Sequence, residues 1–344
     1  MRVMQVMAGA RYGGAEAFFV RLVLALARAG LDQCVVMRRD GRRRSTLGSA
    51  GLVPMELPFG GVMDTVTGRA LRREVARLRP DLVLCWMGRA TRFAPSGRHV
   101  LVGRMGGYYD LKYYRHCDHL VGNTPDIVAY LVREGWAAER AHYLPNFVDE
   151  PANTALARER LGTPEGVPLL LALGRLHENK AFDVLLQALA RLPGVWLWLA
   201  GEGSERRALG ALADRLGVAE RVHFLGWRDD IGSLMATADV CVCPSRHEPL
   251  GNVILEAWAA SKPVVAATAA GPQGLIEDGE TGRLVPIDDA GALAASLGET
   301  IAEPERARTM GEAGHARFRR DHSEPVVVAK YLAFFHRVIE LCAA

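Results

Sequence analysis

Residues 239–257 read DVCVCPSRHEPLGNVILEA, and this stretch decides the fold class of the chain. Its first residues, 239–243, form a short apolar run typical of a buried strand, and residues 253–260 have the spacing of a helix. The segment between them holds prolines and a glycine, the residues of a strand-to-helix loop. Strand, loop and helix in this order form the repeating unit of an α/β fold with a parallel sheet.

The same alternation continues in both directions along the chain. It predicts strands at residues 3–7, 34–37, 82–86, 99–102, 142–144, 169–173, 195–200, 222–225, 239–243 and 263–267. It predicts helices at residues 15–28, 69–78, 125–134, 182–192, 204–216, 231–236 and 253–260. A polar segment at 149–154 separates the two series, so we expect two Rossmann-like domains, 1–150 and 151–324. The terminal helix at 325–344 is apolar on two faces and is expected to pack back on the first domain.

The composition predicts a cytoplasmic protein without a membrane span. Of 344 residues, 49% are apolar and 24% charged, and no run approaches 18 uninterrupted apolar residues. The first 16 residues lack a long apolar core and are interpreted as a strand rather than a signal peptide. The six cysteines show no C-x-x-C spacing and four of them lie in apolar runs, which favours free buried thiols in a reducing compartment.

Basic residues are concentrated in the first half of the chain. Residues 1–150 hold 22 Lys and Arg against 14 Asp and Glu, whereas residues 151–344 hold 20 against 25. A basic face favours an anionic partner, such as a phosphorylated glycolipid, membrane headgroups or nucleic acid. Solvated helix faces are the alternative interpretation. Nucleic acid is disfavoured because no aromatic stacking platform accompanies the arginines.

The loop after the strand at 169–173 carries two cations. Ligands of open parallel sheets bind at the carboxyl ends of the strands, so strand-to-helix loops are the expected place for chemistry. Arg175 offers a planar guanidinium and Lys180 a point charge at a helix entrance, a combination that suits a pyrophosphate. The dinucleotide and P-loop fingerprints are both absent. The alternative is that both cations are only solvated.

Glycines open three further loops. Gly13 and Gly14 follow the first strand, where a helix start presents free N–H groups to an anion. Gly201 and Gly203 allow close approach of the backbone to a nucleotide, as does Gly226 at the end of the strand at 222–225. Each of these loops is equally compatible with an ordinary tight turn.

Two carboxylates mark the loop and helix of the opening stretch. Glu248 lies in the loop and Glu256 in the first turns of the following helix. A carboxylate accepts two hydrogen bonds from a vicinal diol, so one is suited to a sugar and the other to a ribose. The alternative is a capping role for Glu248 and a solvent-exposed position for Glu256.

These motifs, in this order, resemble the retaining, GT-B-fold glycosyltransferases of family 4 over nearly the whole chain. The matching pieces are Gly13-Gly14, Gly174-Arg175-Leu176 with Lys180, Gly201-Glu202-Gly203, Phe224-Leu225-Gly226, Pro244-Ser245 with Glu248 and Glu256, and Thr268 with Gly271 and Ile276 through Val285. The resemblance implies two Rossmann-like domains that face each other across a cleft. It also implies a donor sugar linked to UDP or GDP, and catalysis without a metal or other cofactor. No Asp-x-Asp motif occurs in the chain.

The resemblance assigns roles to the matching residues. Gly14, Arg175 and Lys180 would hold the diphosphate. Glu248 would bind the transferred sugar and Glu256 the ribose. The amides at the helix start would meet the sugar and the phosphates: Leu250, Gly251 and Asn252. Our hypothesis for the mechanism is that the departing phosphate oxygen takes the acceptor hydroxyl's proton on the same face, which would give retention.

The chain departs from the family in two places. Lys180 is followed by Ala181 instead of glycine, and the stretch 102–110 lacks the histidine that family members often carry on the acceptor side. The candidate replacements are Arg104, Tyr108, Tyr109 and Asp110. His119 comes later and is interpreted as a helix-end residue.

The Gly-Gly-Tyr-Tyr turn at 106–109 resembles bacterial lipopolysaccharide-core transferases, which implies a glycan or anionic glycolipid acceptor at the inner membrane. Two alternatives stay open: a sugar-nucleotide epimerase of the same fold, and a sugar-nucleotide-binding protein without catalysis. Product formation without an acceptor would distinguish the epimerase.

Overall fold

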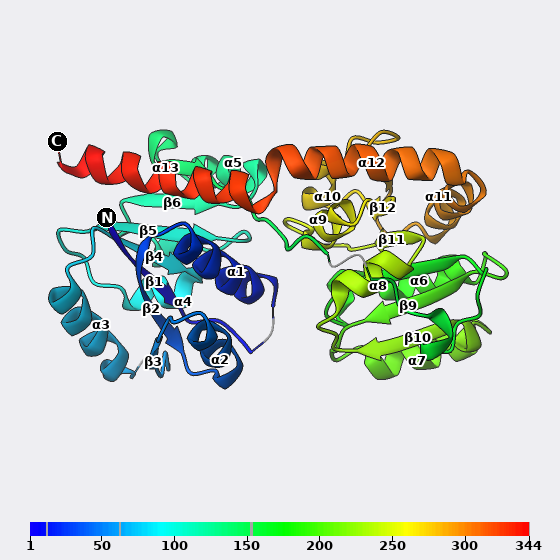
Figure 1. Ribbon diagram of the computed structural model, residues 1–344, viewed down its shortest axis with the longest axis horizontal. Helices are drawn as coiled ribbons and strands as arrows, with labels where there is room; N and C mark the ends of the chain where they lie inside the picture. The colour runs from blue at the N-terminus through cyan, green and yellow to red at the C-terminus, as the bar shows by residue number, and fades with distance from the viewer. Residues whose placement is uncertain (12, 62, 152–153, 344) are drawn as a thin grey trace. The chain divides into compact units, whose positions relative to one another are not determined.

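The computed structural model describes residues 1–11, 13–61, 63–151 and 154–343, and it divides into two compact units (Figure 1). The first domain comprises Met1–Phe147 and Glu324–Ala344, and the second comprises Val148–Ser323. Along the chain, the second domain is therefore inserted before the last helix of the first. Among the described residues, no helix has the length and apolar character that crossing a bilayer requires.

The first domain is built on a parallel sheet with strand order β3-β2-β1-β4-β5-β6-β7. Its strands are β1 (Arg2–Met7), β2 (Asp32–Arg38), β3 (Met55–Leu57), β4 (Leu82–Trp86), β5 (Val100–Met105), β6 (His119–Gly122) and β7 (Ala141–Tyr143). Its helices are α1 (Gly14–Arg28), α2 (Gly41–Ser49), α3 (Thr65–Leu78), α4 (Met87–Phe93), α5 (Pro125–Arg133) and α13 (Glu324–Ala343).

Alternate residues of the strands supply two separate cores in this domain, because successive side chains of a strand point to opposite faces. On β1, Val3 and Met7 join the core beneath α1 and α13, whereas Met4 and Val6 join the core beneath α3, α4 and α5. Both faces of the sheet are thus covered by helices, which explains why its strands read as nearly continuous apolar runs.

Helix α13 is an integral part of the first domain. It packs against α1 and β5 and buries Tyr331, Phe335 and Val338 in the same core as β1 (Figure 1). The helix is twenty residues long, and burial of each large apolar side chain contributes about 1.5–3 kcal/mol. Loss of this helix would therefore expose the part of this core that α1 does not cover.

Arg104 lies in this core and is only 2% exposed. Its guanidinium donates to the Tyr331 hydroxyl at 2.9 Å and to Asn146 Oδ1 at 2.5 Å. The same group lies over the rings of Trp86 and Phe18, at 4.4 and 4.8 Å from their centroids. Arg104 therefore connects β5 to α13 and to Asn146, near the end of residues 1–147. Because its side chain is buried, Arg104 is no longer a candidate to replace the acceptor-side histidine.

The helix-end interpretation of His119 is wrong, because this residue begins β6. Its Nδ1 lies 3.0 Å from His142 Nε2, and Arg337 of α13 lies 3.2 Å from His142 Nδ1. Burial, with the neighbouring His119 and Arg337, lowers the pKa of His142 to about 4.

This pair predicts acid sensitivity of the first domain. The unfolded chain takes up a proton at its histidines near pH 6.5, whereas folded His142 resists protonation until about pH 4. Its contribution to stability is therefore complete above about pH 6.5 and is lost as the pH falls toward 4. We expect His142→Gln to flatten the fall of Tm between pH 7.5 and pH 4.5, roughly the window of this titration. His336→Gln, at an exposed position of α13, is the control and should keep the wild-type slope; equal slopes in all three proteins would contradict the prediction.

The second domain has a parallel sheet with strand order β10-β9-β8-β11-β12-β13. Its strands are β8 (Leu169–Leu173), β9 (Trp196–Ala200), β10 (Val222–Gly226), β11 (Val240–Cys243), β12 (Val264–Ala267) and β13 (Arg283–Val285). Its helices are α6 (Phe182–Leu189), α7 (Arg206–Arg215), α8 (Ile231–Thr237), α9 (Asn252–Ala259), α10 (Ala270–Leu275), α11 (Ala290–Ala302) and α12 (Pro304–Asp321).

Candidate functional site

The strand order of the second domain reverses between β8 and β11. The chain extends the sheet from β8 through β9 to β10, and then returns to the other side of β8 with β11. The loops that leave β8 and β11 therefore diverge from neighbouring strands and open a crevice at their carboxyl ends. In open parallel sheets this switch point is where ligands bind.

Lys180 and Glu248 meet at this switch point. The Lys180 ammonium, from the loop after β8, forms an ion pair with Glu248 Oε2, from the loop after β11. Ser245 Oγ donates to the same oxygen at 3.3 Å, and the Gly251 amide donates to Oε1 at 3.2 Å. The side chains are 25% and 13% exposed, so the pair is mostly withdrawn from water but still reaches the surface.

The ion pair fixes the charge state of the lysine. Burial is the largest single influence and would lower the pKa of Lys180, but the adjacent Glu248 carboxylate, with smaller contributions from Cys243 and Glu256, outweighs it, and the pKa is raised. Glu256, on α9, adds a smaller favourable charge interaction to Lys180, which places it in the same neighbourhood. The lysine is therefore charged at neutral pH, and its ammonium is held by a carboxylate of the neighbouring loop.

Glycines bring the loops after β8 and β9 into backbone contact. The Gly174 amide donates to Ala200 O at 3.0 Å, and the Leu176 amide donates to Glu202 O at 3.0 Å. A Cβ at Gly201 would lie 1.8 Å from Gly174 O, and one at Gly203 would lie 2.2 Å from Leu176 O. Glycine is required at both positions because any side chain would meet backbone. Arg175, between the two contacts of its loop, is exposed.

Helix α9 begins inside the crevice. Gly251 is its N-cap at φ +87°, a left-handed conformation that favours glycine, and Asn252 is its first residue. Leu250 is buried. The loop before the helix is fixed to α10 by a hydrogen bond, in which the Gly271 amide donates to Glu248 O at 2.7 Å. The first amides of a helix are available to an anion, and here they start beside the cation Lys180.

Sequence reasoning assigned no role to two residues that support the Glu248 loop, Arg246 and Gly271. Arg246 grips Asp183 of α6 through two hydrogen bonds, at 2.9 and 2.7 Å, and pairs with Asp288 at 2.5 Å. Arg246 thereby anchors the Glu248 loop to α6. Its position within residues 239–257 was the only indication of this role in the sequence. Gly271 has a similar supporting role, since its Cβ would lie 2.5 Å from Leu250 O.

Gly13 and Gly14 belong to the first domain, where they form the turn into α1. Gly13 is the N-cap of this helix and has no side-chain capping bond. The turn is filled by Glu16, whose Oε1 accepts from the Ala10 amide at 2.7 Å. A Cβ at Gly13 would lie 2.2 Å from Glu16 Oε2, so a larger residue there would displace the Glu16 carboxylate.

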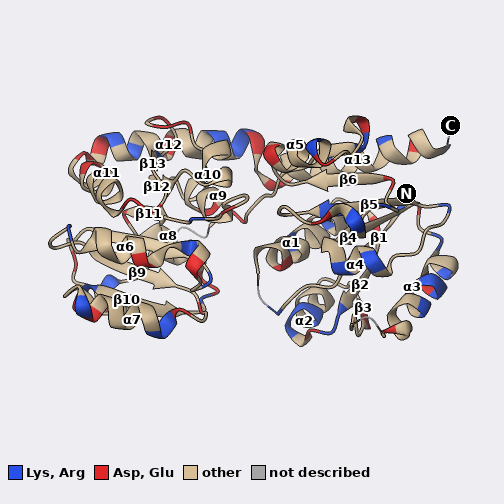
Figure 2. Cartoon of the chain, turned by 180° about the vertical axis from the view of Figure 1, so that it is seen from behind, with Lys and Arg blue, Asp and Glu red and all other residues tan. Residues whose placement is uncertain are grey.

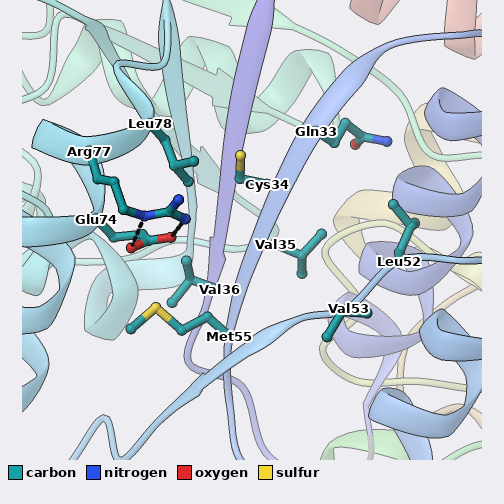
Figure 3. Close-up of a pocket in the computed structure, with 10 residues that line it drawn as sticks. All are labelled: Gln33, Cys34, Val35, Val36, Leu52, Val53, Met55, Glu74, Arg77 and Leu78. Carbon is teal, nitrogen blue, oxygen red and sulfur yellow. Dashed lines mark hydrogen bonds and ion pairs between the residues drawn. The ribbon is translucent and has the colours of Figure 1, made fainter.

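Two other features bear on the chemistry that the chain can perform. Within the described ranges, no group of three or more His, Cys, Asp and Glu side chains is arranged to hold a metal ion. A hollow of about 190 Å³ at the edge formed by β2, β3 and α3 contains Cys34 and a Glu74–Arg77 ion pair (Figure 3). Burial raises the pKa of the Cys34 thiol, which makes it a poor nucleophile. This hollow lies away from the strand-to-helix loops.

Comparison with known proteins covers both domains. Residues 12–150 match the model of Glycosyltransferase Family 4, and residues 167–303 match the model of Glycosyl transferases group 1. The lipopolysaccharide core biosynthesis glycosyltransferase LpsE of Rhizobium meliloti is 38% identical over 93% of this chain and 95% of its own. The corresponding protein LpsD of the same organism is 32% identical over 98% of both chains.

A solved structure gives the same picture of the fold. The Anabaena protein HepE in complex with UDP superimposes with a TM-score of 0.86 at 21% identity, over 98% of this chain and all of the other. At this identity, the likeness shows a shared arrangement of the two domains' elements.

Proposed function

The chain is a glycosyltransferase of family 4 with the GT-B fold, and from this membership we infer that it transfers a hexose from a nucleoside-diphosphate sugar to a saccharide acceptor. The relatives that match nearly its full length are lipopolysaccharide core biosynthesis glycosyltransferases. We therefore place the enzyme in lipopolysaccharide core synthesis. Retention, metal independence and the residue roles below are part of the proposal.

The observation that carries the proposal is the Lys180–Glu248 pair at the switch point. One residue is a lysine held in its charged form, and the other is a carboxylate with defined hydrogen bonds to Ser245 and Gly251. A nucleotide sugar presents both a diphosphate and sugar hydroxyls. Lys180 is suited to the first and Glu248 to the second, and α9 begins beside Glu248, whose Oε1 accepts from the Gly251 amide.

In the proposed reaction, the bond between the sugar's anomeric carbon and the diphosphate oxygen breaks while the acceptor oxygen bonds to the same carbon. The electron pair leaves with the diphosphate, whose growing charge is stabilised by Lys180, Arg175 and the first amides of α9 from Asn252 onward. The acceptor hydroxyl's proton passes to the departing phosphate oxygen on the same face of the sugar, which gives retention. Glu256 would hold the ribose.

The acceptor is proposed to be an anionic glycolipid, reached at the membrane surface. Residues 1–150 carry 22 Lys and Arg against 14 Asp and Glu. Figure 2 shows basic residues on α2, α3 and α4 of the first domain. A juxtamembrane cation contributes about 1 kcal/mol of attraction to an anionic leaflet, so several exposed arginines support peripheral contact.

Nucleotide binding tests the proposal directly. We expect UDP or GDP to raise the Tm of the full-length protein, and the matching monophosphate to raise it much less, because Lys180 and α9 hold the second phosphate. Omitting Mg²⁺ and adding EDTA should leave the binding unchanged, since the cations are supplied by the protein. The measurement is thermal shift followed by calorimetry, with UDP, UMP, GDP, GMP and ADP.

Absence of binding for every nucleoside diphosphate would overturn the proposal, and binding only with Mg²⁺ would overturn metal independence. Incubation with a bound nucleotide sugar but no acceptor separates the transferase from an epimerase. A transferase leaves the sugar's configuration unchanged under these conditions.

A further inference from the structure

The first domain contains a hollow of about 370 Å³ that the roles above do not use. Its walls are loops and a helix that follow β3, β4 and β5, so it lies at the carboxyl edge of the sheet, where α/β sheets bind ligands. The lining residues are Gly60, Gly61, Gly88, Arg89, Arg92, Phe93, Tyr109, Asp110, Tyr113 and Tyr114. The hollow therefore combines cations, aromatic rings and glycines that leave space.

The charge of the hollow is positive. Arg89 and Arg92 are exposed residues of α4, and neither has a carboxylate within ion-pair distance among the residues that the structure describes. The one acidic residue in the lining, Asp110, is paired with Lys112 at 2.6 Å. Two guanidinium groups one helical turn apart on α4 fit a carboxylate or a phosphate, because each offers a planar fork of donors.

The wall of the hollow also holds a buried hydroxyl without a partner. Tyr114 is 0% exposed, and in the described part of the chain its hydroxyl makes no hydrogen bond. Buried hydroxyl groups in folded proteins nearly always have a partner, so this one leaves a hydrogen-bonding position unfilled at the wall of the hollow. A Cβ at Gly88 would lie 3.5 Å from the Tyr114 hydroxyl oxygen, in van der Waals contact. Glycine at this position therefore leaves the space next to the hydroxyl open.

An aromatic ring completes the hollow. Tyr113 is 42% exposed, and the Lys112 ammonium lies 4.9 Å from its ring centroid. An exposed aromatic face offers apolar surface to the C–H face of a sugar ring. The hollow thus provides one group for each part of a charged sugar: cations for its anion, a hydroxyl for its oxygens and a ring for its carbon skeleton.

We propose that this hollow binds an anionic sugar residue of the acceptor, with Arg89 and Arg92 on its phosphate or carboxylate, the Tyr114 hydroxyl on a sugar oxygen and Tyr113 against the ring. The assignment rests on the proposed transferase function and names the chemistry of the acceptor. On this assignment, the polar role of the missing acceptor-side histidine passes to Arg89, Arg92 and the Tyr114 hydroxyl, all outside residues 102–110.

Binding of small sugars to the full-length protein tests the assignment. The probes are glucose 6-phosphate, glucuronate and neutral glucose, each titrated in the presence of saturating UDP or GDP so that the donor's phosphate site is occupied. We expect at least one anionic sugar to bind more tightly than glucose. The double variant Arg89→Gln/Arg92→Gln should weaken that binding by about 10- to 50-fold and leave the Kd of the nucleotide unchanged, as expected for loss of two charge-assisted contacts.

The control is Arg98→Gln, an exposed arginine just beyond α4 and outside the lining, which should bind all probes as the wild type does. Loss with glucose 6-phosphate identifies a phosphorylated sugar, and loss with glucuronate identifies a carboxylated one. Equal binding of all sugars by the wild type and the double variant would overturn the assignment. Failure of the nucleotide to bind is a different result, and it counts against the transferase function.

Tyr114→Phe gives a second test that does not depend on charge. The ring and its packing stay, and only the unpartnered hydroxyl is removed, so the Tm should be unchanged or slightly higher. Affinity for the anionic sugar should fall by about 3- to 10-fold, as for loss of one hydrogen bond. A lower Tm with unchanged sugar affinity would show a structural role for the hydroxyl and contradict the proposal.

Discussion

Lys180→Ala is expected to lower kcat/KM by about 10²- to 10³-fold, the loss typical of removing one preorganised group that stabilises transition-state charge. The lysine is kept charged by Glu248, and the same carboxylate accepts from Gly251 at the start of α9. The diphosphate of the donor is proposed to bind there. Its loss also leaves the largely buried Glu248 carboxylate without its partner. The substitution should therefore reduce both kcat and donor affinity, measured by steady-state kinetics and calorimetry with the nucleotide.

Lys262→Ala is the matched control for this change. Lys262 is a partly buried lysine of the same domain whose ammonium donates to Ala236 O at 2.9 Å, outside the ligand loops. Its removal should lower Tm while kcat/KM stays near the wild-type value. A Lys180→Ala enzyme with near-normal turnover would contradict the proposed stabilisation of the leaving group.

Gly203→Ala is expected to abolish nucleotide binding at concentrations that saturate the wild type, a loss of at least about 100-fold in affinity. The new Cβ would lie 2.2 Å from Leu176 O and 2.7 Å from Leu176 C. A clash with backbone has no side-chain rotation to relieve it, so the loop after β8 must move, and Arg175 and Lys180 move with it. Overpacking of this kind also costs about 1–3 kcal/mol of unfolding free energy.

Gly274→Ala tests whether the effect is specific. Gly274 lies in α10 of the same domain, and a Cβ there would meet nothing within 4 Å. Alanine in a helix favours folding by about 0.5–1 kcal/mol over glycine, so this variant should bind nucleotide normally with an equal or higher Tm. If Gly203→Ala bound nucleotide as tightly as Gly274→Ala, the close packing of the two loops would have no part in binding.

The parallel sheets could be predicted from the sequence because strands buried on both faces read as continuous apolar runs. Helix α12 was not predicted, and its contacts explain why. Its charged sequence packs through small residues: a Cβ at Gly311 would lie 2.2 Å from Ser261 O, and one at Gly314 would lie 2.3 Å from the Trp258 ring. Glycines occupy two of its five buried positions, so only Ala307, Met310 and Phe318 are left to mark the apolar face, a weak signal in a charged sequence.

The candidate site shows a similar division. The loops of Lys180 and Glu248 could be identified from their residue types and their place after strands. The pairing of the two residues could not be predicted, because it requires β8 and β11 to be neighbours in the sheet. Strand order is set by packing over the whole domain. Arg89 gave no signal, and Tyr114 gave one only as part of the segment 112–115 that resembles lipopolysaccharide-core transferases. An arginine on a helix and a buried tyrosine are linked only by the hollow that they share.

The return of α13 to the first domain has a consequence for biosynthesis. A ribosome making this chain releases the strands of the first domain long before the helix that covers one of their faces. At about 5–20 residues per second, translation of Val148–Ser323 keeps that face uncovered for roughly ten seconds or more. The nascent first domain is thus an open hydrophobic surface while its neighbour folds, which makes it a natural client for chaperones during synthesis.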